Sequence, residues 1–127
     1  MKPNSQAKFA YDGLDRVFHE KARLAIMTCL ASHRSGLLFV ELKQLCKLSD
    51  GNLNRHLDVL QEAEAIELER SGAGRSSKTT CKMTRVGRTA FTRYIDELEK
   101  ALKAASDAMK SVKTSGADTR QVRLNSI

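Results

Sequence analysis

The sequence SDGNLNRHLDVLQEAEA, at residues 49–65, has the pattern of a single amphipathic helix. Ser49 is a favourable N-cap, because its hydroxyl can accept a hydrogen bond from an otherwise unpaired N–H of the first turn. Leu53, Leu57 and Leu60 repeat at helical spacing and predict one buried stripe. We therefore expect a helix that begins just after Ser49 and packs along that stripe.

The opposite face of this helix is expected to be polar in its N-terminal half. Its solvent-facing positions are Gly51, Asn52, Asn54 and Arg55. Asn and Arg can make paired hydrogen bonds to base edges, and glycine lets the backbone approach a phosphate. Asp58 would repel phosphate, so only the N-terminal half is expected to meet a nucleic acid. The alternative is an ordinary amphipathic helix with a solvated face, and the neighbouring segments decide between the two.

The segments that precede this helix complete a helix-turn-helix. Residues 14–33 have a helical pattern with an expected bend or boundary at 19–21, and residues 37–39 suit a short strand. Residues 40–46 predict a short helix, which a tight link joins to Ser49. The inward positions around this helix are expected to be Phe39, Leu42, Leu45 and Cys46. A short helix, a short link and a second helix with a polar N-terminal face form a helix-turn-helix.

The apolar period changes from helical to alternating after residue 65. Ile66 and Leu68 alternate with acidic residues, and residues 79–83 alternate in the same way, which predicts a β-hairpin. Its tip, residues 70–78, is basic and rich in glycine and serine, which suits contact with phosphate. The tip positions that we assign to DNA are Arg75, Ser77 and Lys78. Taken alone, such a tip also fits a solvated loop.

A long helix is expected to follow, with Thr84 as its N-cap and its end near Val112. Its apolar positions alternate in steps of four and three over about three heptads, the spacing of a helix–helix seam. We assign the following positions to a dimer interface: Phe91, Ile95, Leu98, Leu102, Ala105 and Met109. The alternative is that this seam packs on the first helix of the same protomer.

Composition and charge limit the class of protein. The net charge of +7 indicates a polyanionic partner. We divide the chain into a flexible arm at 1–11, one domain at 12–112 and a basic, disordered tail at 113–127. No apolar run approaches the ~20 residues of a membrane span, and the N-terminus has no apolar signal core. Three widely spaced cysteines favour a reduced setting, so we expect a cytoplasmic protein without a membrane segment.

These elements, in this order, resemble the winged helix-turn-helix regulators of the MarR and ArsR type. The segment LSDGNLNRHLDVLQEAEAI (48–66) is similar to the recognition segment of a small bacterial and archaeal winged-helix group. The segment LDRVFHEKARLAIMTCLAS (14–32) resembles the opening helix of that group. TTCKMTRVGRTAF (79–91) resembles its closing strand and the start of its last helix. The resemblance covers about residues 12–100 and implies a mainly helical α+β fold with a small hairpin wing and a long C-terminal dimerisation helix.

The resemblance also implies a homodimer that binds double-stranded DNA. The residues that it places near the major groove are Ser49, Asn52, Asn54 and Arg55, and those that it places on the wing are Arg75 and Lys78. Two positions depart from the group's pattern: Lys21 stands where proline is usual, and Glu64 stands where glycine is usual. Neither position is on the expected DNA face.

Other chemistry has less support in the sequence. A metal sensor needs converging thiolates or His–carboxylate pairs, and Cys29 with His33 offers only two ligands. Cys46 stands near two lysines, as in a redox switch, but it also fits an inert inward position. There is no catalytic arrangement or nucleotide-binding motif. We therefore expect a DNA-binding transcriptional regulator that is a homodimeric repressor, not an enzyme, and has no cofactor or metal. The alternatives are a winged-helix protein-interaction module and a metal- or redox-responsive regulator, and a small-molecule effector is left open.

Overall fold

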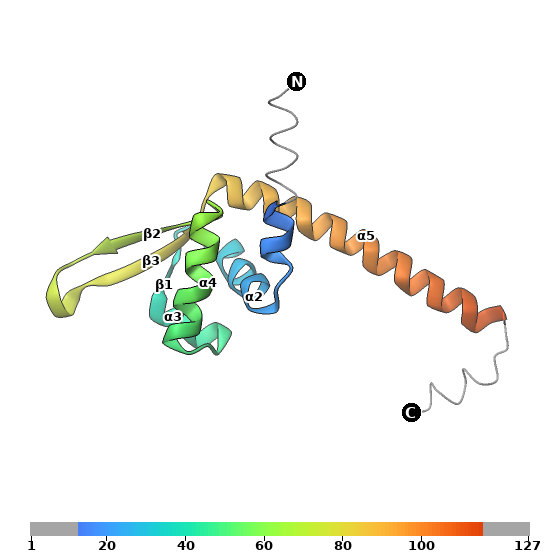
Figure 1. Cartoon of the computed structure of the whole chain (residues 1–127), viewed down its shortest axis with the longest axis horizontal. Coiled ribbons are helices and arrows are strands. Elements are labelled where there is room, and N and C mark those ends of the chain that lie inside the picture. The colour runs from blue at the N-terminus through green and yellow to red at the C-terminus, as the bar shows by residue number, and fades with distance from the viewer. Residues whose placement is uncertain (1–12, 116–127) are drawn as a thin grey trace, which may run out of the picture. The chain divides into compact units, whose positions relative to one another are not determined.

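The computed structural model describes residues 13–115, which fall into two units (Figure 1). The first unit ends at Tyr94 and the second begins at Ile95. Residues 13–18 are helical. The elements that follow are α2 (Lys21–Ala31), β1 (Leu37–Leu38), α3 (Phe39–Cys46), α4 (Asp50–Glu62), β2 (Ile66–Ser71), a 3₁₀ turn (Gly74–Ser76), β3 (Lys78–Met83) and α5 (Arg85–Ser115). The predicted mainly helical α+β fold, with a winged helix-turn-helix and a long last helix, is confirmed.

The two ends of the chain lie largely outside the described residues. This is the case for the predicted arm at 1–11 and for residues 116–127 of the predicted tail. Residues 113–115 of that tail belong to α5, so this helix continues past its expected end near Val112.

The first long helical pattern is interrupted where the sequence predicts a boundary. Residues 19–20 form a bend, and Glu20 has the extended backbone of an N-cap residue. Its Oε1 accepts a hydrogen bond from the backbone N–H of Arg23 at 2.9 Å, so that α2 begins at Lys21. Ile26, Met27 and Leu30 of α2 are buried in the core.

The short helix α3 begins one residue before its predicted start, and one of its inward positions is wrong. Leu42 is buried and Phe39 and Cys46 are half-buried, but Leu45 is 55 % exposed. Phe39 and Leu45 are six residues apart, which places them about 120° apart around a helix of 3.6 residues per turn. The side of α3 that holds Phe39, Leu42 and Cys46 against the core therefore leaves Leu45 in solvent.

The three strands form an antiparallel sheet in the order β1-β3-β2. In the hairpin, β2 pairs with β3 from Ile66 opposite Met83 to Ser71 opposite Lys78. β1 adds Leu37 opposite Cys81 on the other side of β3. Figure 1 shows the hairpin extending beyond the helices of the first unit, as a wing. Its base packs on the core through Ile66 and Cys81, which are buried.

The start of α5 completes the core of the first unit. Phe91 and Tyr94 are buried, and the ring of Phe91 meets the ring of Phe18 edge-on with centroids 5.2 Å apart. The Tyr94 hydroxyl is hydrogen-bonded to Nδ1 of His19 at 2.8 Å. Aromatic pairs in this geometry add to the stability that burial provides. Phe91 thus contributes to the core of its own chain.

The end of α4, the start of β2 and the start of α5 meet at one junction. The N–H of Ala65 donates to the carbonyl of Leu60 and that of Glu64 to Gln61, both at 2.9 Å, which closes α4 in a Schellman motif. Glu64 adopts φ +64°, the left-handed conformation that its motif usually gives to glycine. Thr84 caps α5 as predicted, since its Oγ1 accepts from the N–H of Gly87 at 2.9 Å.

Thr84 also ties α5 to the end of α4. Its hydroxyl donates to the carbonyl of Glu64 at 2.7 Å, and its N–H donates to the carbonyl of Ala65 at 3.0 Å. These contacts bring the first turn of α5 so close to Ala65 that a Cβ on Gly87 would lie 2.1 Å from the Ala65 oxygen. The junction therefore needs glycine at position 87 because of space.

The second unit, as far as it is described, is the remainder of α5. Its large apolar side chains lie at heptad spacing, and Leu102, Met109 and Val112 are 61 %, 73 % and 62 % exposed. The opposite charges along this helix form exposed pairs, such as Lys103 with Asp107 at 3.0 Å. Pairs of this kind add only a few tenths of a kcal/mol each.

Candidate nucleic-acid interface

The helix α4 has one apolar and one polar face, as its sequence predicts. Leu53, Leu57 and Leu60 are buried, and Ser49 accepts a hydrogen bond from the N–H of Asn52 at 3.2 Å as the N-cap. The polar positions that the sequence assigns to DNA are all exposed: Ser49, Gly51, Asn52, Asn54 and Arg55. The helix therefore presents one hydroxyl, two amides and a guanidinium to solvent at a single end.

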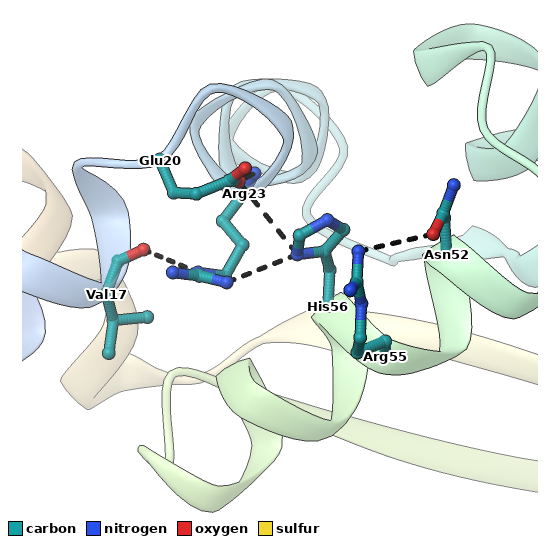
Figure 2. Close-up of polar contacts among 6 residues, drawn as sticks. All are labelled: Val17, Glu20, Arg23, Asn52, Arg55 and His56. Atoms are coloured by element: carbon teal, nitrogen blue, oxygen red, sulfur yellow. Dashed lines mark hydrogen bonds and ion pairs between the residues drawn. The ribbon is translucent and has the colours of Figure 1, made fainter.

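Arg55 and Asn52 are linked on this face. The Nη2 of Arg55 donates to Oδ1 of Asn52 at 3.2 Å, across one helical turn (Figure 2). This contact orients the guanidinium toward the N-terminal end of α4 and away from Asp58. It uses one of the five N–H donors of the guanidinium, so the others stay available for an external acceptor.

A second polar contact joins the two helices of the helix-turn-helix at the same end. Lys43 of α3 and Asp50 of α4 form an ion pair with Nζ and Oδ1 2.8 Å apart. Both side chains are well exposed, so the pair adds little to stability. Its local effect is to neutralise the carboxylate that stands closest to the expected DNA face. No pattern in the sequence predicts this pair.

The inner edge of α4 is fixed by a polar cluster that the sequence pattern likewise does not predict (Figure 2). His56 is only 7 % exposed, and its Nδ1 lies 3.2 Å from Nη1 of Arg23 on α2. The Nε of Arg23 donates to the carbonyl of Val17 at 2.7 Å. The Glu20 carboxylate lies 3.9 Å from the same imidazole nitrogen. The cluster connects α4 to the bend before α2.

The electrostatics of this cluster favour a neutral imidazole. Burial lowers the pKa of His56, the Glu20 carboxylate opposes that change, and the charges of Arg23 and Arg55 add to it. The pKa of Glu20 is lowered, mainly by the hydrogen bond from the N–H of Arg23. Since Arg23 can only donate, the unprotonated Nδ1 of His56 is its acceptor.

The tip of the wing is shorter than the sequence predicts. Arg70, Ser71 and Lys78 were expected in the loop, but they lie in paired strands, so only residues 72–77 connect β2 to β3. Arg75 lies in the 3₁₀ turn of this connection. The wing positions assigned to DNA are all exposed: Arg75, Ser77 and Lys78. The structure thus places Lys78 on a regular strand, with a more defined direction than a loop would give.

Two of the cysteines, Cys46 and Cys81, are thiols with a raised pKa. Burial raises the pKa of Cys81 to about 11. Burial, the nearby Cys29 and a hydrogen bond with it raise the pKa of Cys46 to about 11. A raised pKa keeps Cys46 in its thiol form, whereas a redox-switch role for Cys46 would use the thiolate.

The described residues offer no metal site and no membrane helix. Between residues 13 and 115, His, Cys, Asp and Glu side chains nowhere gather in a group of three or more that could hold a metal ion. The Nδ1 of His33 is hydrogen-bonded to the carbonyl of Cys29 at 2.8 Å. Within the same part of the chain, every helix is too short or too polar to span a bilayer.

The positions that the sequence assigns to a dimer interface differ in their surroundings. Phe91 is buried in the first unit. Ile95 and Leu98 are half-buried, whereas Leu102, Ala105 and Met109 are exposed. The exposed part of the seam therefore belongs to the second unit, from about residue 102 onward.

The polar end of α4, the capped junction and the paired wing are the parts of a winged helix, and comparison with known proteins agrees. Residues 22–102 match the family described as "Winged helix DNA-binding domain". The chain belongs to this family. The predicted resemblance to winged helix-turn-helix proteins is thus confirmed.

One related protein and one solved structure are similar to this chain. The winged-helix chain is 36 % identical over 86 residues to the uncharacterized protein MJ0432 of Methanocaldococcus jannaschii, a match that spans 65 % of this chain and 89 % of that protein. A transcriptional regulator homologue from Pyrococcus horikoshii OT3 has a similar structure. Its TM-score is 0.66 at 23 % identity, and the match covers 71 % of this chain and 88 % of the other.

Two structures of regulators from bacteria share the fold at lower similarity. The M. tuberculosis transcriptional regulator MosR, in complex with DNA, gives a TM-score of 0.55 at 20 % identity, over 98 % of this chain and 84 % of its own. A MarR-family regulator from Silicibacter pomeroyi gives 0.54 at 20 % identity, over 95 % of this chain and 80 % of its own. The winged helix of this chain therefore has the fold of MarR-type regulators.

Proposed function

We propose that this chain is a homodimeric transcriptional repressor that binds double-stranded DNA in a sequence-specific manner and is not an enzyme. The observation that carries the proposal is the polar N-terminal half of α4. Its amides and guanidinium are exposed together, while the other face of the same turns is fully buried. The membership of a DNA-binding family and the likeness to a regulator seen with DNA support it.

In this proposal α4 enters the major groove with its N-terminal end. The Arg55 guanidinium donates hydrogen bonds to O6 and N7 of a guanine. Asn52 and Asn54 form hydrogen bonds with adenine or with phosphate. The wing crosses the adjacent backbone, where Arg75 and Lys78 neutralise phosphates without reading bases. The Lys43–Asp50 pair keeps an acidic side chain from repelling the backbone at that end.

The exposed seam of α5 supports the homodimer. Leu102, Met109 and Val112 lie on one side of the second unit and are more than half exposed. A soluble helix that carries such a stripe at heptad spacing is expected to bury it against a second helix. A second copy of the same chain supplies an identical stripe and gives a closed, two-fold dimer. Such a dimer presents two α4 helices to two half-sites.

The test of sequence reading is site selection from random duplexes with the parent protein and with Arg55→Ala. We expect the variant to lose its preference at one base pair per half-site, because a bidentate Arg–guanine contact contributes about 1–3 kcal/mol of discrimination. Gln61→Ala is the matched control, since this exposed residue lies on the C-terminal half of the same helix. An unchanged site in Arg55→Ala would show that Arg55 does not read bases.

The wing is tested by the salt dependence of binding to a random duplex. Arg75→Ala with Lys78→Ala should flatten the slope of log K against log salt by about two to four units for a dimer. Lys100→Gln with Lys103→Gln removes the same charge from α5 and should leave the slope unchanged. The proposal of a wing on the DNA backbone fails if both double variants keep the parent slope.

The same titration separates this proposal from the protein-interaction alternative. An interaction module that uses only the α5 seam has no need of a basic α4 and wing. It would bind random duplex weakly and with little response to Arg75 and Lys78.

The dimer is tested by light scattering at micromolar concentration. Leu102→Glu with Met109→Glu places two carboxylates in the seam and should give monomers. Ala104→Glu with Ser111→Glu makes the same charge change two positions further along, about 200° around the helix, and should stay dimeric. A monomeric parent protein would refute the proposed assembly.

A further inference from the structure

A second basic site lies at the start of α5, where three separate segments meet. Arg34 comes from the turn between α2 and β1, Met83 ends β3, and Arg85 and Arg88 belong to the first turns of α5. Together with Thr84 they line a surface pocket of about 240 Å³. Three arginines therefore line one small concave space, although Arg34 is far from the other two in the sequence.

Within residues 13–115, no ion pair balances the charges of the three arginines in this pocket. The lining residues include no Asp or Glu. Arg88 is half-buried and its Nη1 donates to the carbonyl of Ala31 at 3.4 Å, which directs this side chain without neutralising it. Arg34 and Arg85 are exposed and form no ion pair within residues 13–115. Like charges that share a site repel one another unless an anion joins them.

The backbone adds to the positive field. The pocket is at the N-terminal end of a helix that is 31 residues long, where the aligned peptide dipoles carry a partial positive charge. Thr84, which caps this helix, also lines the pocket. Guanidinium groups match the oxygen geometry of phosphate, with which they form paired hydrogen bonds.

The pocket lies at the opposite end of α4 from the proposed DNA contacts. Thr84 is hydrogen-bonded to the carbonyls of Glu64 and Ala65, just past the last turn of α4. The DNA-facing residues begin at Ser49, and a helix of 13 residues is about 20 Å long. A duplex on the N-terminal end of α4 therefore leaves this pocket to another ligand.

We propose that the Arg34–Arg85–Arg88 pocket binds the phosphate group of a small phosphorylated ligand. The three guanidiniums hold the phosphate oxygens, and Thr84 lines the same space. The site is separate from the proposed DNA contacts on the N-terminal half of α4 and at the tip of the wing, and its existence does not depend on the proposed DNA function. A ligand bound there contacts the junction that joins the recognition helix to α5.

The experiment is calorimetry with inorganic pyrophosphate in a chloride buffer, without DNA. We expect one pyrophosphate per protomer for the parent protein, and at least tenfold weaker binding for Arg34→Gln with Arg85→Gln. Both substitutions are at exposed side chains, so the fold is retained, which a thermal melt checks. Arg16→Gln with Lys21→Gln removes the same two charges from exposed positions elsewhere and should bind like the parent.

Position is checked by NMR, in which pyrophosphate should shift the backbone amide signals of Thr84 and Arg88 in the parent protein. Equal binding by the parent and the Arg34/Arg85 variant would overturn the proposal, because the anion would then lie elsewhere. Absence of binding at 10 mM would overturn it too. A third result would also overturn it: the parent protein does not bind pyrophosphate, and the Arg34/Arg85 variant has a lower affinity for duplex DNA. The pocket would then belong to the DNA surface. Because the titration contains no DNA, its failure leaves the proposed DNA function untouched.

Discussion

Replacing Gly87 by alanine is expected to lower the free energy of unfolding by about 1–2 kcal/mol, although alanine is the better helix former. The new Cβ would lie 2.1 Å from the carbonyl oxygen of Ala65 and 2.8 Å from its carbonyl carbon. Both are backbone atoms, which no side-chain rotation can move. The start of α5 and the end of α4 must therefore separate by about 1.2–1.5 Å to reach an ordinary C···O contact of about 3.3–3.6 Å.

The size of the effect follows from the contacts that this separation breaks. Thr84 makes two hydrogen bonds across the junction, to Glu64 at 2.7 Å and to Ala65 at 3.0 Å. Each is worth about 0.5–1.5 kcal/mol, so their loss costs about 1–3 kcal/mol. The higher helix propensity of alanine returns up to about 1 kcal/mol.

The assay is urea unfolding at one fixed protomer concentration, since association would shift the midpoint. Gly51→Ala is the matched control, because Gly51 also lies in the first turn of a helix but a Cβ there meets no atom within 4 Å. We expect that control to be stabilised, by up to about 1 kcal/mol. A Gly87→Ala protein with a midpoint at or above that of the parent would refute the steric reasoning.

Three further predictions concern other sites. The pKa of His56 is lower in the folded protein than in the unfolded chain, so the unfolded chain binds more protons. The folded protein therefore loses stability as the pH falls from about 6.5, the usual pKa of histidine, through the lowered value. His56→Asn keeps an acceptor for Arg23 but does not titrate, so unfolding curves should show less loss over that range, and an identical pH profile would count against this role. Glu64→Gly should raise the free energy of unfolding by about 0.5–1 kcal/mol in urea, because glycine adopts the left-handed conformation without strain, and a lower value would contradict this. Cys81, with a pKa of about 11 and no exposed surface, should react with a thiol reagent at pH 8 only as fast as the protein unfolds, and labelling at the rate of a free thiol would disprove its burial.

Local sequence pattern was sufficient for most of the fold. The N-cap Ser49 and the leucines of α4 act within a few residues of one another, and so do the alternating residues of the hairpin. The pattern failed for Leu45, because α3 has only eight residues and the packing of the rest of the chain decides which of its apolar residues face inward. The length of the wing tip could not be predicted either, because it depends on the register in which β2 pairs with β3, and neither segment determines that register alone.

The site was predictable only for the part that lies on one element. The exposed residues of α4 follow from helix geometry and the position of its buried stripe. The contact between Arg23 and His56 joins residues 33 positions apart, and no periodicity in the sequence connects them. The arginine pocket likewise depends on how a turn, a strand end and a helix start are brought together.

The aromatic cluster at the start of α5 has a consequence for how the chain is made. Phe18 is fully buried, but its ring partners Phe91 and Tyr94 come from the other end of the first unit, and the His19–Tyr94 hydrogen bond spans 75 residues. Contacts this distant along the chain form only after the entropy cost of closing the loop has been met. During synthesis on a ribosome the N-terminal helices must therefore wait, with Phe18 uncovered, until the first turns of α5 have left the exit tunnel. A chain that stops before residue 91 lacks the rings that cover Phe18, which makes it a natural target for chaperones and proteases.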